Sequence, residues 1–330
     1  MRLLMLGGTG FVGPAVVEAA LARGFEVTVL NRGNRPAPPG VTVLRGDRLA
    51  EGGLAALTDG TWDLVVDAWH AAPRAVRDAA RLLAGRAGHY TYVSSRSVYV
   101  WPMPAGLDET GPVQDGSPDA DATTYAQDKR GGELAAEAAF GERALFVRCG
   151  AILGPREDIG RLPWWLERIA RGGRVLAPGP RDLPLQYVDV RDLAAWLLDA
   201  AARGLGGPYD LVSPSGHATM GGLLDACVVV TGSDAELCWV EPEAVLAAGV
   251  APWNEAPVWI PPGETHDALH RSDVTRALET GLRCRPVAET VADTWDWMRH
   301  GDPPQPLPDW LRPVGIDPEK ETMLLRAYGT

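Results

Sequence analysis

Cysteine is scarce in this chain of 330 residues and is never closely paired. Its four cysteines are widely separated and form no CxxC motif: Cys149, Cys227, Cys238 and Cys284. Such spacing is typical of buried thiols in a reducing compartment and not of a disulfide framework or a zinc site. His266 and His270 are four residues apart, but no third ligand lies near them in the sequence. We therefore expect a cytoplasmic protein without a metal centre.

The chain also lacks long apolar runs and an excess of positive charge. No stretch approaches the roughly 18 consecutive apolar residues of a membrane-spanning helix, and the first apolar run meets Gly7 too early for the centre of a signal peptide. The 31 Lys and Arg residues against 43 Asp and Glu give a net charge of -12, which disfavours nucleic acid and anionic membranes as partners. We expect a small-molecule substrate, and a local group of residues must bind any phosphate.

Phenylalanine is rare as well, with 4 residues against 12 tryptophans. Most of the tryptophans lie beyond residue 160: Trp164, Trp165, Trp196, Trp239, Trp253, Trp259, Trp295, Trp297 and Trp310. Tryptophans usually anchor a core or an interface. The better candidates for substrate contact are Trp164 and Trp165, near the opening of a second lobe, and Trp253 in a proline-rich segment.

The first half of the chain alternates regularly between strands and helices. Short apolar runs predict strands at residues 3–6, 26–30, 41–44, 64–66, 90–93 and 145–147. Between the first two, residues 11–23 have helical spacing, and Gly24 is placed to end that helix. Strands separated by such helices form βαβ units, so we expect an α/β fold with a Rossmann-type, doubly wound parallel sheet.

Beyond residue 150 the pattern loosens. A helix is predicted at 163–171, and a strand at 185–188 with a helix at 190–202 returns to the regular style. From residue 213 onward, helices alternate with proline-rich loops up to a proline-dense tail around 303–313. We therefore expect a dinucleotide-binding domain formed by residues 1–155 and 183–212. Residues 156–182 and 213–330 form a smaller, interleaved C-terminal substrate-binding lobe and tail.

A glycine-rich segment, residues 7–13, directly follows the first predicted strand and opens the first predicted helix. Glycine is needed in such a loop for a positive φ, for close approach of the backbone to a pyrophosphate, and for packing of helix on strand. The free N–H groups of the helix start then face the diphosphate. The residues expected to bind a cofactor here are Gly7, Thr9, Gly10, Phe11, Val12 and Gly13.

The end of the second predicted strand carries arginines and no carboxylate. Sites for NAD usually have an Asp or Glu at this point for the ribose 2′-hydroxyl, whereas guanidinium groups favour a 2′-phosphate. Asn31, Arg32 and Arg35 therefore predict a cofactor site that prefers NADP(H), with NAD(H) as the alternative. Surface arginines solvated on a loop would leave the same pattern.

Two further segments carry groups for proton transfer. Tyr125 and Lys129 are four residues apart, so on a helix their side chains project from the same face one turn apart. The ammonium is expected to lower the pKa of the phenol, which makes it a usable acid or base. Ser95 belongs to a serine cluster at the end of the fifth predicted strand, and ligands of open α/β sheets lie at the carboxyl ends of the strands.

Taken together and in this order, these features resemble the extended short-chain dehydrogenase/reductase superfamily, also called the NAD-dependent epimerase/dehydratase family. The resemblance covers most of the chain through residues 7–13, 93–99, 125–129, 147–155 and 187–194. It implies that Ser95, Tyr125 and Lys129 are catalytic, that Lys129 also holds the ribose hydroxyls, and that Asp47 lies near the adenine. A homodimer is common in the family and is expected here only by resemblance.

One departure from the family pattern narrows the reaction. Dehydratases of the family have Asp-Glu where this chain has Arg96 and Ser97, and a guanidinium cannot replace a carboxylate that moves protons. Dehydration is therefore disfavoured, whereas 4-epimerisation remains possible, because simple 4-epimerases need only the Tyr, the Ser and a tightly held NAD. Arg96 is a candidate to pair with a substrate carboxylate or phosphate; the alternative is an arginine that bridges local backbone or acidic groups.

These residues predict an NAD(P)-dependent oxidoreductase that reduces a carbonyl, or an imine, of a small molecule with Tyr125 as general acid/base. His70, after the fourth predicted strand, is a second-rank candidate for a proton relay. Two alternatives remain: a nucleotide-sugar 4-epimerase with tightly bound NAD, and a dinucleotide-sensing or RNA-binding member of the fold without catalytic activity.

Overall fold

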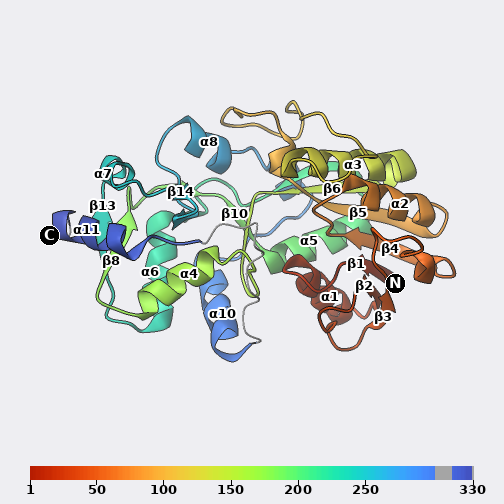
Figure 1. The fold of residues 1–330 in the computed structure, drawn as a ribbon, viewed down its shortest axis with the longest axis horizontal. Helices are drawn as coiled ribbons and strands as arrows, with labels where there is room; N and C mark the ends of the chain where they lie inside the picture. The colour runs from red at the N-terminus through yellow and green to blue at the C-terminus, as the bar shows by residue number, and fades with distance from the viewer. Residues whose placement is uncertain (302–313, 329–330) are drawn as a thin grey trace.

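The computed structural model describes residues 1–301 and 314–328, so the predicted tail at 303–313 and Trp310 lie outside the described residues. A parallel sheet of seven strands, in the order β11-β6-β5-β4-β1-β2-β3, forms one half of the molecule (Figure 1). Its strands are β1 (Arg2–Leu6), β2 (Glu26–Asn31), β3 (Thr42–Arg45), β4 (Trp62–Asp67), β5 (Ala87–Ser95), β6 (Ala144–Cys149) and β11 (Gly207–Leu211). This order is that of a doubly wound fold, which confirms the predicted class.

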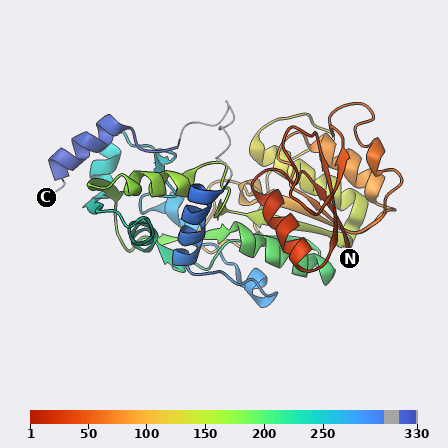
Figure 2. The same ribbon diagram turned by 90° about the horizontal axis from the view of Figure 1, so that it is seen from below.

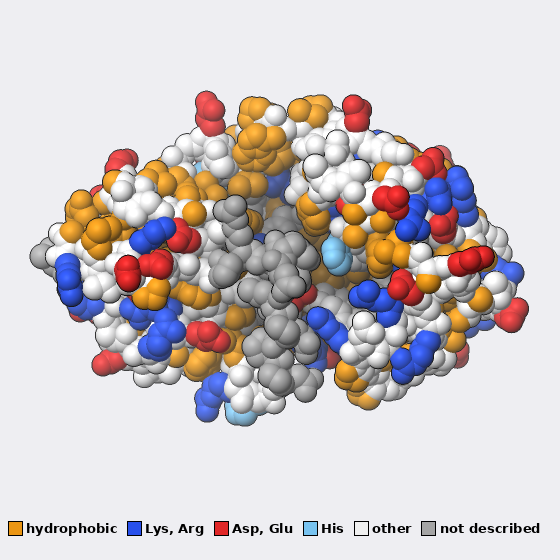
Figure 3. Space-filling model, viewed as in Figure 1, with side chains coloured by type: hydrophobic (Ala, Val, Ile, Leu, Met, Phe, Trp, Pro, Cys, Tyr) orange, Lys and Arg blue, Asp and Glu red, His pale blue; other side chains and the backbone are white. Residues whose placement is uncertain are grey.

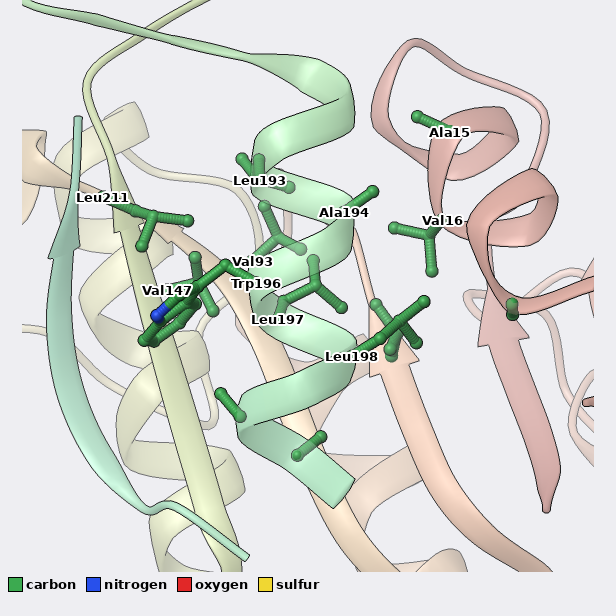
Figure 4. Close-up of a cluster of buried hydrophobic side chains, with 14 of the residues drawn as sticks. Ala15, Val16, Val93, Val147, Leu193, Ala194, Trp196, Leu197, Leu198 and Leu211 are labelled. Atoms are coloured by element: carbon green, nitrogen blue, oxygen red, sulfur yellow. The ribbon is translucent and has the colours of Figure 1, made fainter. Parts of the chain in front are cut away.

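The sheet is buried on both faces because alternate residues of its strands contact different helices. Leu3 and Met5 of β1 share a cluster with α1 (Val12–Ala22) and α5 (Val190–Ala202). Leu4 and Leu6 share another cluster with α2 (Pro73–Leu83) and α3 (Tyr125–Phe140). Figure 4 shows Leu193 and Leu197 of α5 among the side chains of the first cluster, with Val16 of α1 nearby. The carboxyl ends of the strands are left open to hold a site.

The other half of the molecule is a lobe of helices with short strand pairs (Figure 2). Its helices are α4 (Arg161–Ala170), α6 (Met220–Thr231), α7 (Pro242–Ala247), α8 (Glu264–His270), α10 (Val287–His300) and α11 (Pro318–Tyr328). Helix α9 (Thr275–Glu279) instead packs against β11 of the sheet, where Ala277 joins the cluster of α1 and α5. Its strand pairs are β7 (Ala151–Leu153) with β10 (Tyr187–Asp189), β8 (Arg174–Pro178) with β13 (Glu236–Val240), β9 (Pro184–Leu185) with β12 (Ala218–Thr219), and β14 (Pro252–Trp253) with β15 (Ala256–Pro257). No helix within the described ranges has the length and apolar character to cross a membrane.

Two local differences from the predicted elements have clear causes. Helix α4 begins at Arg161, before the predicted start, because the Glu157 carboxylate accepts the N–H groups of Arg161 and Leu162 at 3.1 Å each. The predicted strand at 185–188 is split into β9 and β10. Between them, the N–H of Gln186 donates to Nδ1 of His270 (2.9 Å) instead of to a neighbouring strand.

Candidate active site

The glycine segment adopts the predicted loop between β1 and α1. Gly7 and Gly8 have φ values of 119° and 68°, a region that favours glycine. A Cβ on Gly13 would lie 2.5 Å from the Cα of Gly8, so the close packing of the helix start on the loop also requires glycine. A Cβ on Gly10, by contrast, would meet open space. No side chain caps α1, which leaves its first N–H groups available to an anion.

A cavity of about 780 Å³ lies at the carboxyl ends of the strands, and it brings together every predicted catalytic and cofactor-binding residue. Its lining includes Gly7, Thr9, Gly10, Phe11, Val12, Gly13, Asn31, Arg32, Arg35, Asp47, Ser95, Tyr125 and Lys129. His70 also lines it. Figure 3 shows a hollow between the two halves of the molecule, with Lys and Arg side chains near its rim on the side of the sheet. Residues from distant parts of the chain therefore share one site.

The residues present fit a dinucleotide on two observations. The Asn31 side chain is buried, and its Oδ1 accepts the N–H of Gly33 (2.8 Å), while its Nδ2 has no partner among the described residues. A buried amide nitrogen without a partner is costly unless a ligand accepts its hydrogen bond. In addition, Arg35 donates to the carbonyl of Thr9 (3.3 Å), so its guanidinium lies beside the glycine loop.

At the wall of the cavity, which Arg48 lines, a buried ion pair joins the segment after β3 to the end of β4. Both terminal nitrogens of Arg48 donate to the Asp67 carboxylate at 2.7 Å, and the Tyr90 hydroxyl donates to the same carboxylate. Arg48 also donates to the carbonyl of Ala75 (2.8 Å). These contacts leave Asp67 fully enclosed and hold the segment after β4, which includes His70, against the sheet.

The predicted catalytic trio, Ser95, Tyr125 and Lys129, comes from β5 and α3. The Thr124 hydroxyl caps α3, so the helix begins at Tyr125 and places Lys129 one turn later. Tyr125 is 50% exposed, while Lys129 and Ser95 are buried. The Ser95 hydroxyl lies at the end of β5, where it accepts the N–H of Ser97 at 3.1 Å. This arrangement leaves the phenol facing the cavity with the serine hydroxyl beside it.

The electrostatics of the trio differ from the sequence expectation. Desolvation raises the pKa of Tyr125, and the hydrogen bond with Ser95 opposes that rise. Lys129 does not lower it, because Nζ lies 5.9 Å from the centre of the Tyr125 ring and donates to the carbonyls of Trp69 and Val93, each at 2.7 Å. Burial in turn lowers the pKa of Lys129 to about 8. Without cofactor, the ammonium is therefore held by backbone oxygens.

His70 lies in the cavity wall with an imidazole that favours the neutral form. Desolvation lowers the pKa of His70, and the charges of Lys129 and Arg32 lower it further. A neutral imidazole can pass a proton, so its place agrees with a relay role.

Arg96 lies outside the cavity, although it follows Ser95 directly. Its side chain is 3% exposed, and Nε donates to the Asp210 carboxylate at 3.1 Å. Its terminal nitrogens donate to the carbonyls of Leu269 and Ala268, each at 3.3 Å. The structure therefore favours the second interpretation of Arg96, a bridge between an acidic group and the backbone, over contact with a substrate.

The candidate tryptophans belong to the core of the lobe and do not line the cavity. Trp165 is fully buried and donates from Nε1 to the carbonyl of Pro257 (2.9 Å). Trp164 packs edge-on against Trp165 with ring centres 4.7 Å apart, and Trp253 lies under the guanidinium of Arg161. The structure thus places all three in packing roles.

Sequence reasoning missed several lining residues that follow strand ends, among them Trp69 after β4, Gly150 after β6 and Asp158 after β7. The same rule that located Ser95 could have found them, since each follows a strand toward the open edge of the fold. Desolvation raises the pKa of Asp158. In the part of the chain that the structure describes, no group of three or more His, Cys, Asp or Glu side chains is placed to hold a metal ion.

The chain belongs to the NAD dependent epimerase/dehydratase family, whose model matches residues 3–210. This confirms the predicted resemblance and the expectation of an NAD-dependent enzyme of the reductase or epimerase type. A 2′-dehydrokanamycin reductase from Streptomyces kanamyceticus is 33% identical over 183 residues, which are 52% of this chain and 50% of the reductase. The chain therefore spans about half the length of this curated relative.

Solved structures share the fold. A UDP-glucose 4-epimerase from Thermus thermophilus, solved with NAD, has a TM-score of 0.62 at 23% identity and covers 92% of this chain and 100% of its own. The Bordetella bronchiseptica enzyme WbmG, solved with NAD and UDP, has a TM-score of 0.66 at 18% identity, with coverages of 93% and 99%. A human epimerase family protein solved with NADPH has a TM-score of 0.60 at 21% identity, with coverages of 90% and 99%. At these identities the likeness establishes the fold alone.

Proposed function

We propose that the chain is an NADP(H)-preferring reductase that converts a carbonyl, or an imine, of a small molecule to the alcohol or amine. The observation that carries this proposal is the single cavity lined by Ser95, Tyr125 and Lys129 together with Arg32 and Arg35. A reductase needs a proton donor, a polarising hydroxyl and a dinucleotide site within one enclosure.

The cofactor is assigned from the residues of the cavity. Residues 7–13 and the start of α1 would hold the diphosphate, Asn31 and Asp47 the adenosine part, and the side chains of Arg32 and Arg35 a 2′-phosphate. Lys129 would hold the ribose hydroxyls next to the nicotinamide. When bound, the nicotinamide supplies a hydride. The preference for NADP(H) rests on the two guanidinium groups and on the lack of a carboxylate at the end of β2.

The residues of the chain then complete the reduction. The Ser95 hydroxyl donates a hydrogen bond to the acceptor oxygen, which makes the carbonyl carbon more electrophilic. The Tyr125 O–H donates its proton to that oxygen, so that one hydride and one proton give the alcohol. The raised pKa of Tyr125 keeps the phenol protonated before the reaction. We infer that His70, which lines the same cavity, returns a proton from solvent.

The charge of the cavity wall favours this function over the nucleotide-sugar 4-epimerase. Among the described residues that line the cavity, those later in the chain than Lys129 carry no positive charge: Cys149, Gly150, Ile152, Asp158 and Ile159. A sugar nucleotide brings a second diphosphate, which needs cations or helix N-termini beyond those of the cofactor site. Asp158 instead suits a neutral or amine-bearing substrate. The similarity to a reductase supports the same choice.

The first experiment measures NADPH consumption with a panel of polyhydroxy ketones, some of them neutral and some bearing an amine. UDP-glucose is tested beside them. We expect net NADPH consumption with a ketone and none with the sugar nucleotide. Asp158→Asn should raise KM for amine-bearing ketones and leave KM for neutral ketones unchanged. Interconversion of UDP-glucose and its 4-epimer without net NADPH consumption would instead support the epimerase.

Two further inferences concern the setting of the enzyme. All four cysteines are free thiols, which supports a cytoplasmic location. The net charge of -12 supports small molecules rather than nucleic acid as partners. Sedimentation of the purified chain tests the homodimer that the family resemblance implies.

A further inference from the structure

The two residues that flank Ser95 in the sequence, Ser94 and Arg96, belong to one buried polar network. On one side, the Ser94 hydroxyl donates to the Glu133 carboxylate (2.7 Å), and Glu133 lies on α3, the helix that begins at Tyr125. Arg148 of β6 holds the same carboxylate through two nitrogens, at 2.9 and 3.0 Å. The backbone before Ser95 is thus fixed to the helix that carries the phenol.

On the other side, Arg96 joins three segments that are distant in the sequence. Its Nε donates to Asp210 of β11, and its terminal nitrogens donate to the last carbonyls of α8. The Asp210 carboxylate also accepts from the Tyr99 hydroxyl (2.7 Å), and Arg148 donates to that hydroxyl (3.1 Å). The two sides of the network therefore meet at Tyr99.

Helix α8 is tied to the rest of the lobe at the same end. His270, its last residue, accepts the N–H of Gln186 through Nδ1 (2.9 Å), and the Gln186 side chain donates to the carbonyls of Ser213 and Ser272. Arg96 is thus the link from the strand end that bears Ser95 to the lobe that faces it.

The energetics argue for a role in geometry rather than in stability. The Arg96 and Asp210 side chains are 4% and 0% exposed, and burial of two charges costs more than an apolar pair of similar size in many proteins. We therefore attribute the pair to structural specificity: it stabilises one relative arrangement of β5, β11 and α8 over others. Arg96 also cannot serve as a substrate ligand, because its donors are directed to Asp210 and α8.

We propose that Arg96 and Asp210 are positioning residues, which hold Ser95 in line with Tyr125 by joining the end of β5 to the end of α8. This inference rests on the proposed function. It assigns the two residues no contact with substrate or cofactor.

The pair has a testable pH dependence. Burial raises the pKa of Asp210 to about 6, opposed by Arg96 and the Tyr99 hydroxyl. The other charged groups that face Asp210 are Glu109, whose carboxylate accepts its N–H (2.8 Å), and Arg148. As pH falls through about 6, Asp210 is protonated and loses its charge-assisted bonds. A misplaced catalytic group can cost about 10-fold to 100-fold in rate, so kcat should fall on the acid side.

The test compares Arg96→Ala, Arg96→Lys and Asp210→Asn with Arg168→Ala as a matched control. Arg168 pairs with Glu321 in the lobe, with both side chains 11% exposed, and lies outside the cavity. We expect Arg96→Ala and Asp210→Asn to lower kcat about 10-fold to 100-fold with NADPH affinity unchanged. Arg96→Lys should recover part of that loss, Asp210→Asn should lose the acid limb near pH 6, and Arg168→Ala should keep the wild-type kcat.

Hydrogen exchange gives a readout that needs no turnover. Amides of residues 264–270 and of the end of β5 should exchange faster in Arg96→Ala and Asp210→Asn than in wild type, but not in Arg168→Ala. A folded Arg96→Ala with wild-type kcat, or equal losses of kcat and NADPH affinity, overturns the proposal. If wild type reduces no carbonyl, the proposed function fails, and the exchange data still decide whether the link holds the two segments. If Arg96→Ala does not fold, Arg96→Lys and Asp210→Asn replace it in both readouts.

Discussion

At the scale of single residues, Tyr125 combines exposure with a shifted proton affinity. Half of its surface is open, and desolvation raises the pKa of the phenol. Tyr125→Phe removes only the O–H, so we expect kcat to fall about 100-fold to 10,000-fold with little change in NADPH affinity. Steady-state kinetics and cofactor titration measure the two quantities. Tyr328→Phe, on an exposed face of α11, serves as the control, and a wild-type kcat in Tyr125→Phe would falsify the assigned role.

Cofactor choice is expected to depend on two guanidinium groups. Each charge-assisted bond to a phosphate contributes about 1.5–3 kcal/mol. The double variant Arg32→Ala with Arg35→Ala should therefore weaken NADPH binding about 100-fold or more and NADH binding far less. Titration of both cofactors against the variant measures the ratio. Arg81→Ala on the exposed face of α2 is the control, and equal losses for both cofactors would show that other residues read the 2′-phosphate.

Lys129 predicts an alkaline limit to activity. Burial lowers its pKa to about 8, so the free enzyme loses the cation as pH rises through that value. Because the proposed role of the cation is to donate to the ribose hydroxyls of the cofactor, kcat/KM for NADPH should fall above about pH 8. A bound anionic cofactor stabilises the charged form of Lys129. Because kcat reports on the cofactor-bound enzyme, kcat should remain constant to a higher pH than kcat/KM. The side chain in Lys129→Arg keeps its charge at every accessible pH. If kcat/KM of that variant still falls near pH 8, the fall arises from another group.

The residues of the site differ in how far sequence could locate them. Ser95 and the glycines lie at strand ends, which a parallel sheet brings to one edge, and Tyr125 is located by its helical spacing from Lys129. The contacts of the Arg96 side chain could not be predicted in this way, because its partners Asp210 and α8 are more than 100 residues away in the sequence. The same holds for Trp165, whose partner Pro257 lies in β15, far away in the sequence.

At the scale of elements, loss of one partner of the buried pair of Arg48 and Asp67 is expected to destabilise the fold, because it leaves the other charge buried and unpaired. Their side chains are 5% and 0% exposed, and loss of one partner of such a pair costs about 3–5 kcal/mol. Asp67→Ala should lower the free energy of unfolding by that amount in a urea titration. The exposed pair of Arg23 and Asp199 offers the control, because Asp199→Ala should cost less than about 1 kcal/mol. Similar losses in both variants would contradict this view of the pair.

The elements of the sheet could be predicted because their signals are local. Strands β1, β2, β4, β5 and β6 are largely buried runs rich in apolar residues, whereas the edge strand β3 is mostly exposed. Helices α1 and α5 have helical spacing with clear ends. The short strands of the lobe have no such signal. β9 and β14 contain two residues each, and β9 ends where the N–H of Gln186 donates to His270, a residue far away in the sequence.

At the scale of the whole molecule, an acidic chain encloses a locally basic site. The net charge is -12, yet Arg32, Arg35 and Lys129 line one cavity. The second half of the chain also completes the first, because α5 covers the sheet and β11 extends it. Composition could set the charge balance, but it could not show which side chains of the lobe face the site.

The central claim is that the enzyme transfers a hydride to a carbonyl with net consumption of NADPH. The most direct measurement uses NADPH with deuterium at both C4 positions, so that either face transfers the label, and follows the label into the product by mass spectrometry. We predict one deuterium on the carbinol carbon for each NADPH consumed, and no label with Tyr125→Phe above the residual rate. An unlabelled product, formed while NAD stays bound and no NADPH is consumed, would contradict the account.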